Sequence, residues 1–104
     1  MATQYITTEG SVFDMEEDLY NPGNLLFVDQ YSIKTTDGTT TSVVVGSGSE
    51  EGYVEGVGEA ARFKTIFGFK QISITQLLVA DSGNQCLRSV DRETNQTSLF
   101  TVSP

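Results

Sequence analysis

Residues Gly46 to Asp91 read GSGSEEGYVEGVGEAARFKTIFGFKQISITQLLVADSGNQCLRSVD, and they decide the fold prediction. The stretch opens with a glycine-rich acidic loop, Gly46 to Gly58, which carries too few apolar residues to form a core. Short apolar runs separated by turn residues follow, a pattern typical of antiparallel strands. We therefore predict an all-β chain.

Part of this stretch occurs twice. Leu25 to Asp29 (LLFVD) matches Leu77 to Asp81 (LLVAD), and 81 − 29 places the copies 52 residues apart. A Thr-Ser pair opens the last strand of each copy, at Thr41-Ser42 and Thr97-Ser98. A repeat of about this length with four short strands is typical of β-propeller blades.

The repeat divides the chain into two four-stranded antiparallel units. The first spans about residues 11–46, with a turn at Pro22-Gly23 and a hairpin at Asp37-Gly38. Residues 47–66 form a loop, and the second unit spans about 67–102. Thr3 to Thr8 are rich in β-forming residues and predict a further strand.

Composition excludes several function classes. The 104 residues suffice for one modest core, and a net charge of −8 repels nucleic acid and anionic membranes. Histidine is absent, which removes the commonest general base and metal ligand, so we expect neither an enzyme nor a bound cofactor. Cys86 is the only cysteine, and neither a membrane span nor a secretory leader is predicted, so we expect a soluble chain.

Two motifs resemble the NHL-repeat family of β-propellers. Leu77 to Arg88 (LLVADSGNQCLR) is similar to the strand and hairpin of that repeat, and Glu55 to Phe63 (EGVGEAARF) is similar to its glycine-rich loop. The first copy, Val28 to Ile33, is degenerate and lacks the Gly-Asn pair. Phe67 stands where the family has proline, and Glu55 where it has aspartate. The resemblance implies two propeller blades in this chain.

Two blades cannot close a ring, because propellers contain 4 to 8. Stacked blades have apolar faces, so an isolated pair would expose two of them. We expect three chains to complete a six-bladed propeller by homotrimerisation through a heterologous contact, with Thr3 to Thr8 exchanged onto a neighbouring blade. Alternatively, the chain is a piece of a longer propeller, or partner proteins supply the missing blades.

The candidate site residues have structural roles in this interpretation. Those assigned to turns are Asp29, Asp81, Gly83 and Asn84, whose side chains or glycine conformation suit hairpins. Those assigned to the inter-blade loop are Gly56, Gly58, Ala61 and Phe63. Arg88 is expected to pair with a carboxylate of a neighbouring strand or blade, with anion recognition as its alternative.

Four further patterns each have a simpler interpretation. Gly56 to Ala61 fits the dinucleotide fingerprint G-x-G-x-x-A but lacks the strand before it and the helix after it. The acidic residues Asp14, Glu16, Glu17 and Asp18 could hold Ca²⁺, but they lack EF-hand spacing and are expected to form a solvated loop. Cys86 is expected to be a small buried residue, and Asn95-Gln96-Thr97 a chance glycan triplet.

These observations predict a non-catalytic scaffold that assembles with itself. Its rim loops, Glu50 to Gly58 and Asp14 to Asn24, would bind a protein or peptide. The alternative is a Ca²⁺-dependent ligand-binding or hydrolytic propeller with acidic residues in its central channel. A third possibility is a self-assembling repeat fragment without a ligand.

Overall fold

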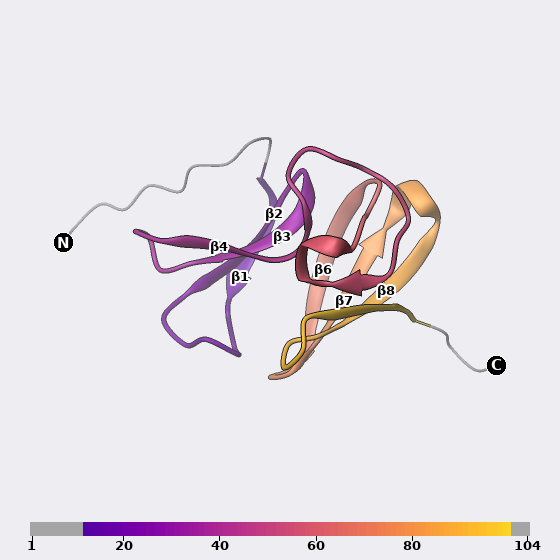
Figure 1. Cartoon of the computed structure of the whole chain (residues 1–104). Helices are drawn as coiled ribbons and strands as arrows, with labels where there is room; N and C mark the ends of the chain where they lie inside the picture. Colours follow the sequence, from indigo (N-terminus) through magenta and orange to yellow (C-terminus); the bar gives the residue numbers. More distant parts are fainter. Residues whose placement is uncertain (1–11, 101–104) are drawn as a thin grey trace.

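The computed structural model describes residues 12–100, and side chains from Met15 onward. The strand predicted at Thr3 to Thr8 lies outside the described residues. The described chain is all-β: two antiparallel sheets lie side by side, the first at the left of Figure 1 and the second at the right. Within this range the helical segments are two short 3₁₀ turns, η1 (Gly58–Ala60) and η2 (Ser82–Asn84).

The first sheet has four strands in sequence order; the loop of residues 18–24 joins the first two, and tight turns join the others. They are β1 (Val12–Glu17), β2 (Leu25–Asp29), β3 (Tyr31–Thr36) and β4 (Thr41–Ser47). Gly46 has φ +92°, and a Cβ there would lie 2.2 Å from the Tyr31 carbonyl oxygen, so only glycine fits this position of β4.

The second sheet has five strands in the order β5-β9-β8-β7-β6, one more than the sequence predicted. Its long strands are β6 (Ile66–Ser73), β7 (Gln76–Asp81), β8 (Cys86–Asp91) and β9 (Gln96–Leu99). The extra strand, β5 (Gly56–Val57), comes from the predicted loop and pairs with β9. Two residues are too few to give a recognisable strand pattern in the sequence.

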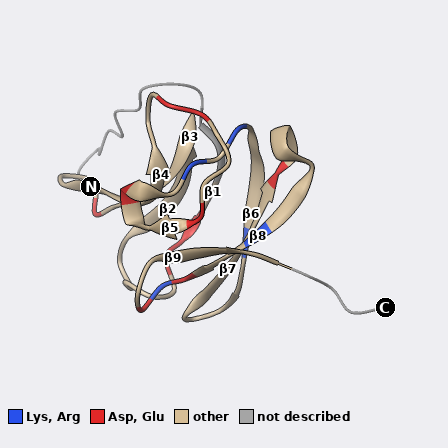
Figure 2. Cartoon of the chain, turned by 45° about the vertical axis from the view of Figure 1, so that its right-hand side comes forward, with Lys and Arg blue, Asp and Glu red and all other residues tan. Residues whose placement is uncertain are grey.

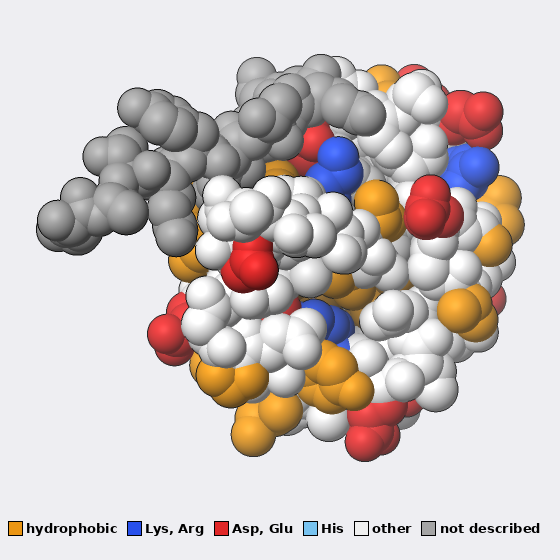
Figure 3. Space-filling view, turned by 60° about the vertical axis from the view of Figure 1, so that its left-hand side comes forward, with side chains coloured by type: hydrophobic (Ala, Val, Ile, Leu, Met, Phe, Trp, Pro, Cys, Tyr) orange, Lys and Arg blue, Asp and Glu red, His pale blue; other side chains and the backbone are white. Residues whose placement is uncertain are grey.

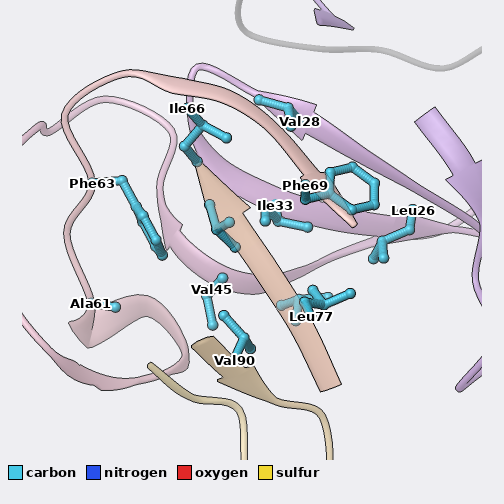
Figure 4. Close-up of a cluster of buried hydrophobic side chains, with 12 residues drawn as sticks. Leu26, Val28, Ile33, Val45, Ala61, Phe63, Ile66, Phe69, Leu77 and Val90 are labelled. Carbon is cyan, nitrogen blue, oxygen red and sulfur yellow. The ribbon is translucent and has the colours of Figure 1, made fainter. Parts of the chain in front are cut away.

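The core lies between the sheets (Figure 4). The first sheet contributes Leu26, Val28 and Ile33, and the second contributes residues such as Leu77, Val79 and Val90, all at most 1% exposed. Burial of each such side chain contributes roughly 1.5–3 kcal/mol. The segment 48–65, called the connector below, adds Ala61 and Phe63 to the same core.

The two sheets repeat each other at the level of strand register. In the first sheet Phe27 pairs with Lys34, and in the second Val79 pairs with Arg88. Asp29 pairs with Ser32 as Asp81 pairs with Cys86, so the β7–β8 turn is two residues longer. The matching LLFVD and LLVAD segments therefore occupy the same place in their sheets, as strands β2 and β7.

Candidate functional site

The first cluster of buried polar residues holds the connector against the second sheet. Asp81 is fully buried, and its Oδ1 accepts hydrogen bonds from the backbone N–H groups of Lys64 (3.0 Å) and Thr65 (3.4 Å). Its Oδ2 accepts from Asn84 Nδ2 at 2.8 Å and from Arg88 NH1 at 3.0 Å. One carboxylate thus joins the β7–β8 turn, strand β8 and the connector.

Arg88 sits at the centre of this cluster. Its guanidinium lies 4.6 Å from the ring centroids of both Tyr53 and Phe63, within the range of a cation–π contact. It donates hydrogen bonds to the carbonyl oxygens of Arg62 (2.6 Å) and Val54 (2.8 Å). Because the side chain is fully buried, these partners leave it no room to recognise an external anion.

Asn84 and Gly83 complete the attachment. Asn84 Nδ2 also donates to the Gly52 carbonyl oxygen at 2.9 Å. A Cβ on Gly83 would lie 2.7 Å from Lys64 Cβ, so the glycine permits the close approach of the connector. Asp81 was expected to bond the amides of its own turn, but its main-chain partners belong to the connector, 16 and 17 residues earlier.

The first sheet carries a simpler version of the same pair. Asp29 is fully buried and accepts a hydrogen bond from Lys34 Nζ at 2.8 Å. Lys34 occupies the register position of Arg88, since each pairs with the central residue of its repeat, Phe27 or Val79. The predicted turn residue Asp29 therefore belongs to an ion pair with Lys34, and the second sheet has the equivalent ion pair of Asp81 and Arg88.

A third ion pair, unlike the other two, joins the two sheets, and the sequence interpretation missed it. Arg92, 4% exposed, donates to both carboxylate oxygens of Asp18, NH1 to Oδ1 at 2.8 Å and NH2 to Oδ2 at 3.0 Å. Asp18 is fully buried, and its Oδ2 also accepts from Thr35 Oγ1 at 2.6 Å. The prediction that Asp18 lies in a solvated acidic loop is wrong.

Burial of the Asp18 carboxyl by itself raises its pKa. The hydrogen bonds from Arg92 and Thr35 and the charge of Arg92 outweigh this effect and lower the pKa to about 2. The carboxylate is therefore ionised at neutral pH, and it neutralises the buried guanidinium. Asp18 also caps the turn that follows it, because its Oδ1 accepts hydrogen bonds from the N–H groups of Tyr20 and Asn21. An aspartate just before a turn is the sequence signal that could have indicated this role.

An open groove lies beside this ion pair, with a volume of about 330 Å³. Its walls come from the β1–β2 loop, strands β3 and β4, and the β8–β9 turn. Polar, uncharged side chains dominate the lining, with Arg92 already neutralised by Asp18; the lining residues are Tyr20, Asn21, Asn24, Thr35, Ser42, Val43, Val44, Arg92 and Asn95.

The other predicted loop residues also take structural positions. Gly56 pairs with Thr97 in the β5–β9 ladder, and Gly58 N–H donates to the Asn95 carbonyl oxygen at 2.9 Å. Only the three-residue turn η1 follows, so the G-x-G-x-x-A match opens no α-helix. Of the expected rim loop Asp14 to Asn24, residues up to Glu17 belong to strand β1.

The described residues contain no group of three or more metal-ligating side chains. Acidic residues lie on strands as well as on loops of both sheets (Figure 2), and they are scattered singly over the face shown in Figure 3. Cys86 is half-buried, not fully buried as expected, and partial burial together with the Asp81 charge raises the pKa of its thiol.

No protein-family model and no curated protein matches the chain. No helix among the described residues has the length and apolar character needed to cross a membrane.

Proposed function

We propose that this protein is a non-catalytic β-propeller scaffold of the NHL-repeat type that assembles with itself and presents rim loops to a protein or peptide. Each sheet would be one blade, and three chains would supply a six-bladed ring. The proposal depends on one observation. The row of side chains that the first sheet buries has an equivalent row in the second sheet, and that row points outward.

The register equivalence defines these rows. In the first sheet Leu26, Val28 and Ile33 face the second sheet and are fully buried. Val28 pairs with Ile33, and the equivalent pair in the second sheet is Ala80 and Leu87. Because Leu77 and Val79 point into the core, the alternating residues Leu78 and Ala80 point to the opposite face.

The outer face carries a short apolar row that is incompletely covered, beside the polar residues Lys70 and Ser89, which pair with Leu78. Leu87 is 42% exposed, and Leu78 and Ala80 are half-buried. Phe67, at the register shift between Ile66 and Gly68 of β6, is 78% exposed. A row of this kind on a sheet face is typical of an interface.

Repetition also sets the type of contact. Within one chain, the buried face of the first sheet packs against the second sheet. If the outer face of the second sheet packs in the same way, it must contact the first sheet of another chain, on the face that points away from that chain's own second sheet. Such a contact is heterologous, and it closes a ring when the rotation per chain allows. Three chains of two blades fall within the 4 to 8 blades of known propellers.

The charge and the side-chain clusters support a scaffold that binds other proteins. The net charge of −8 disfavours RNA and anionic membranes as partners. The three buried ion pairs, Asp18–Arg92, Asp81–Arg88 and Asp29–Lys34, hold their charges in fixed positions, an arrangement that rigidifies a fold.

Light scattering on a matched pair of variants tests the proposal. Leu87→Asp places a charge in the outer row, whereas Val57→Asp places one on β5, at the sheet edge, where Val57 is 55% exposed. We expect a trimer for the wild type and Val57→Asp, and a monomer of 11.3 kDa for Leu87→Asp. A wild-type monomer, or a trimer that Leu87→Asp leaves intact, would refute this interface.

A further inference from the structure

The outer edges of the two sheets differ although their strands correspond. Strand β9 is covered by β5, through the pairs Gly56 with Thr97 and Val57 with Gln96. Strand β4 is the last strand of the first sheet. Among residues 12–100, no main-chain hydrogen bond joins its outer edge to another segment.

The two edges are equivalent positions of the repeat. Thr35 pairs with Ser42 and Thr36 with Thr41, as Ser89 pairs with Ser98 and Val90 with Thr97. Thr41 thus corresponds to Thr97, the residue of β9 that pairs with Gly56 of β5. In the second sheet, an extended segment fits against this end of the edge.

The open part of this edge is the part nearest the groove. Thr41 and Ser42 are exposed and Val43 is half-buried, whereas Val44 and Val45 are buried under η1 and the core. Ser42 and Val43 also line the groove, opposite residues of the β1–β2 loop and the β8–β9 turn. A strand added at Thr41–Val43 would therefore place a side chain beside the groove.

From this arrangement we infer that the edge of β4 is a peptide-binding site, at which an extended, non-acidic peptide of a partner protein adds as a fifth strand. Main-chain hydrogen bonds to Thr41–Val43 supply affinity, and the groove selects a polar side chain, because its amides and hydroxyls offer both donors and acceptors. The negative net charge favours neutral or basic peptides. This inference deepens the peptide-binding part of the proposed function, and it holds whether or not the ring forms.

The probe is the peptide acetyl-Lys-Val-Thr-Val-Lys-amide, whose β-branched residues favour an extended chain. Titrated into ¹⁵N-labelled protein, it should shift the amide signals of Thr41–Val43 and the side-chain signals of Asn21 and Asn95, with a Kd on the order of 1 mM, about −4 kcal/mol. A version N-methylated at alternate residues lacks the main-chain donors of one edge and is the matched control. At the same concentration, the N-methylated peptide should cause shifts at least tenfold smaller than those of the unmodified peptide.

Three results would overturn the inference. The first is an equal response to the N-methylated peptide. The second is shifts that map to Leu78, Ala80 and Leu87 and not to β4. The third is slow hydrogen exchange of the outward amides of Thr41–Val43 in the free protein, which would mean that another segment already covers the edge. None of these depends on the mass of the assembly, so failure of the peptide site is distinguishable from failure of the ring.

Discussion

The buried pair of Asp18 and Arg92 offers the sharpest test of how the two sheets are held together. Asp18→Asn keeps the shape of the side chain and an oxygen that accepts hydrogen bonds, but it removes the charge that neutralises Arg92. The change therefore isolates the electrostatic contribution of a contact between residues 74 positions apart in the chain.

The magnitude follows from the pKa. A carboxyl with a pKa of about 2 in the folded protein and 3.8 when unfolded stabilises the fold by about 2 kcal/mol at neutral pH, at roughly 1.4 kcal/mol per pH unit. Loss of one partner of a buried ion pair costs up to about 5 kcal/mol, because the remaining charge is uncompensated. We expect Asp18→Asn to lower the free energy of unfolding at pH 7 by about 2 to 5 kcal/mol.

The pH dependence has a definite sign. Because the folded pKa is lowered, the contribution is fully present well above pH 3.8 and is lost as the pH falls towards 2. Between pH 7 and pH 2, wild type should therefore lose about 2 kcal/mol more stability than Asp18→Asn, whose side chain does not titrate.

Urea unfolding of both proteins at a series of pH values measures this difference. Glu51→Gln, which removes a carboxylate from an exposed position in the connector, is the matched control. It should stay within about 0.5 kcal/mol of wild type at pH 7. If Asp18→Asn is as stable as the control at pH 7 and follows the same pH dependence as wild type, the ion pair does not hold the sheets together as described.

Three further changes test the core and the cluster of Asp81, Asn84 and Arg88 that holds the connector. Arg88→Gln leaves Asp81 without its cation and should destabilise the protein by about 3–5 kcal/mol in urea unfolding, whereas Glu50→Gln, which breaks the exposed pair with Arg62, should cost less than about 1 kcal/mol; equal effects would contradict the buried role of Arg88. Gly83→Ala should cost about 1–3 kcal/mol, because its Cβ would meet Lys64 at 2.7 Å, and an unchanged melting temperature would argue against that close approach. Phe63→Ala should lower the free energy of unfolding by about 3–5 kcal/mol and speed hydrogen exchange in the connector. A loss of stability without faster exchange there would mean that Phe63 does not help to hold the connector.

The strands and the repeat were predictable because their signals are local. LLFVD and LLVAD are continuous apolar runs that turn residues follow, and they form β2 and β7. The sequence also indicated that Arg88 pairs with a carboxylate of a neighbouring strand, and it bonds Asp81 of β7. Pairs of this kind follow from strand alternation over a short hairpin.

The long-range contacts were not predictable in the same way. Asp18 follows Glu16 and Glu17, so composition alone suggested a solvated loop, whereas its partner Arg92 lies in a distant turn. The sequence of the connector has no strand or helix periodicity from which its position could be predicted. It is held in place by hydrogen bonds between its backbone and the side chains of Asp81, Asn84 and Arg88. Strand β5 exists only because β9 offers it an edge.

The central claim is that the outer face of the second sheet repeats the buried face of the first and is covered by another copy of the chain. A native mass spectrum at micromolar concentration tests it directly. The account predicts a single species of three chains, about 34 kDa from three times 11.3 kDa. A species of 11.3 kDa alone would contradict it.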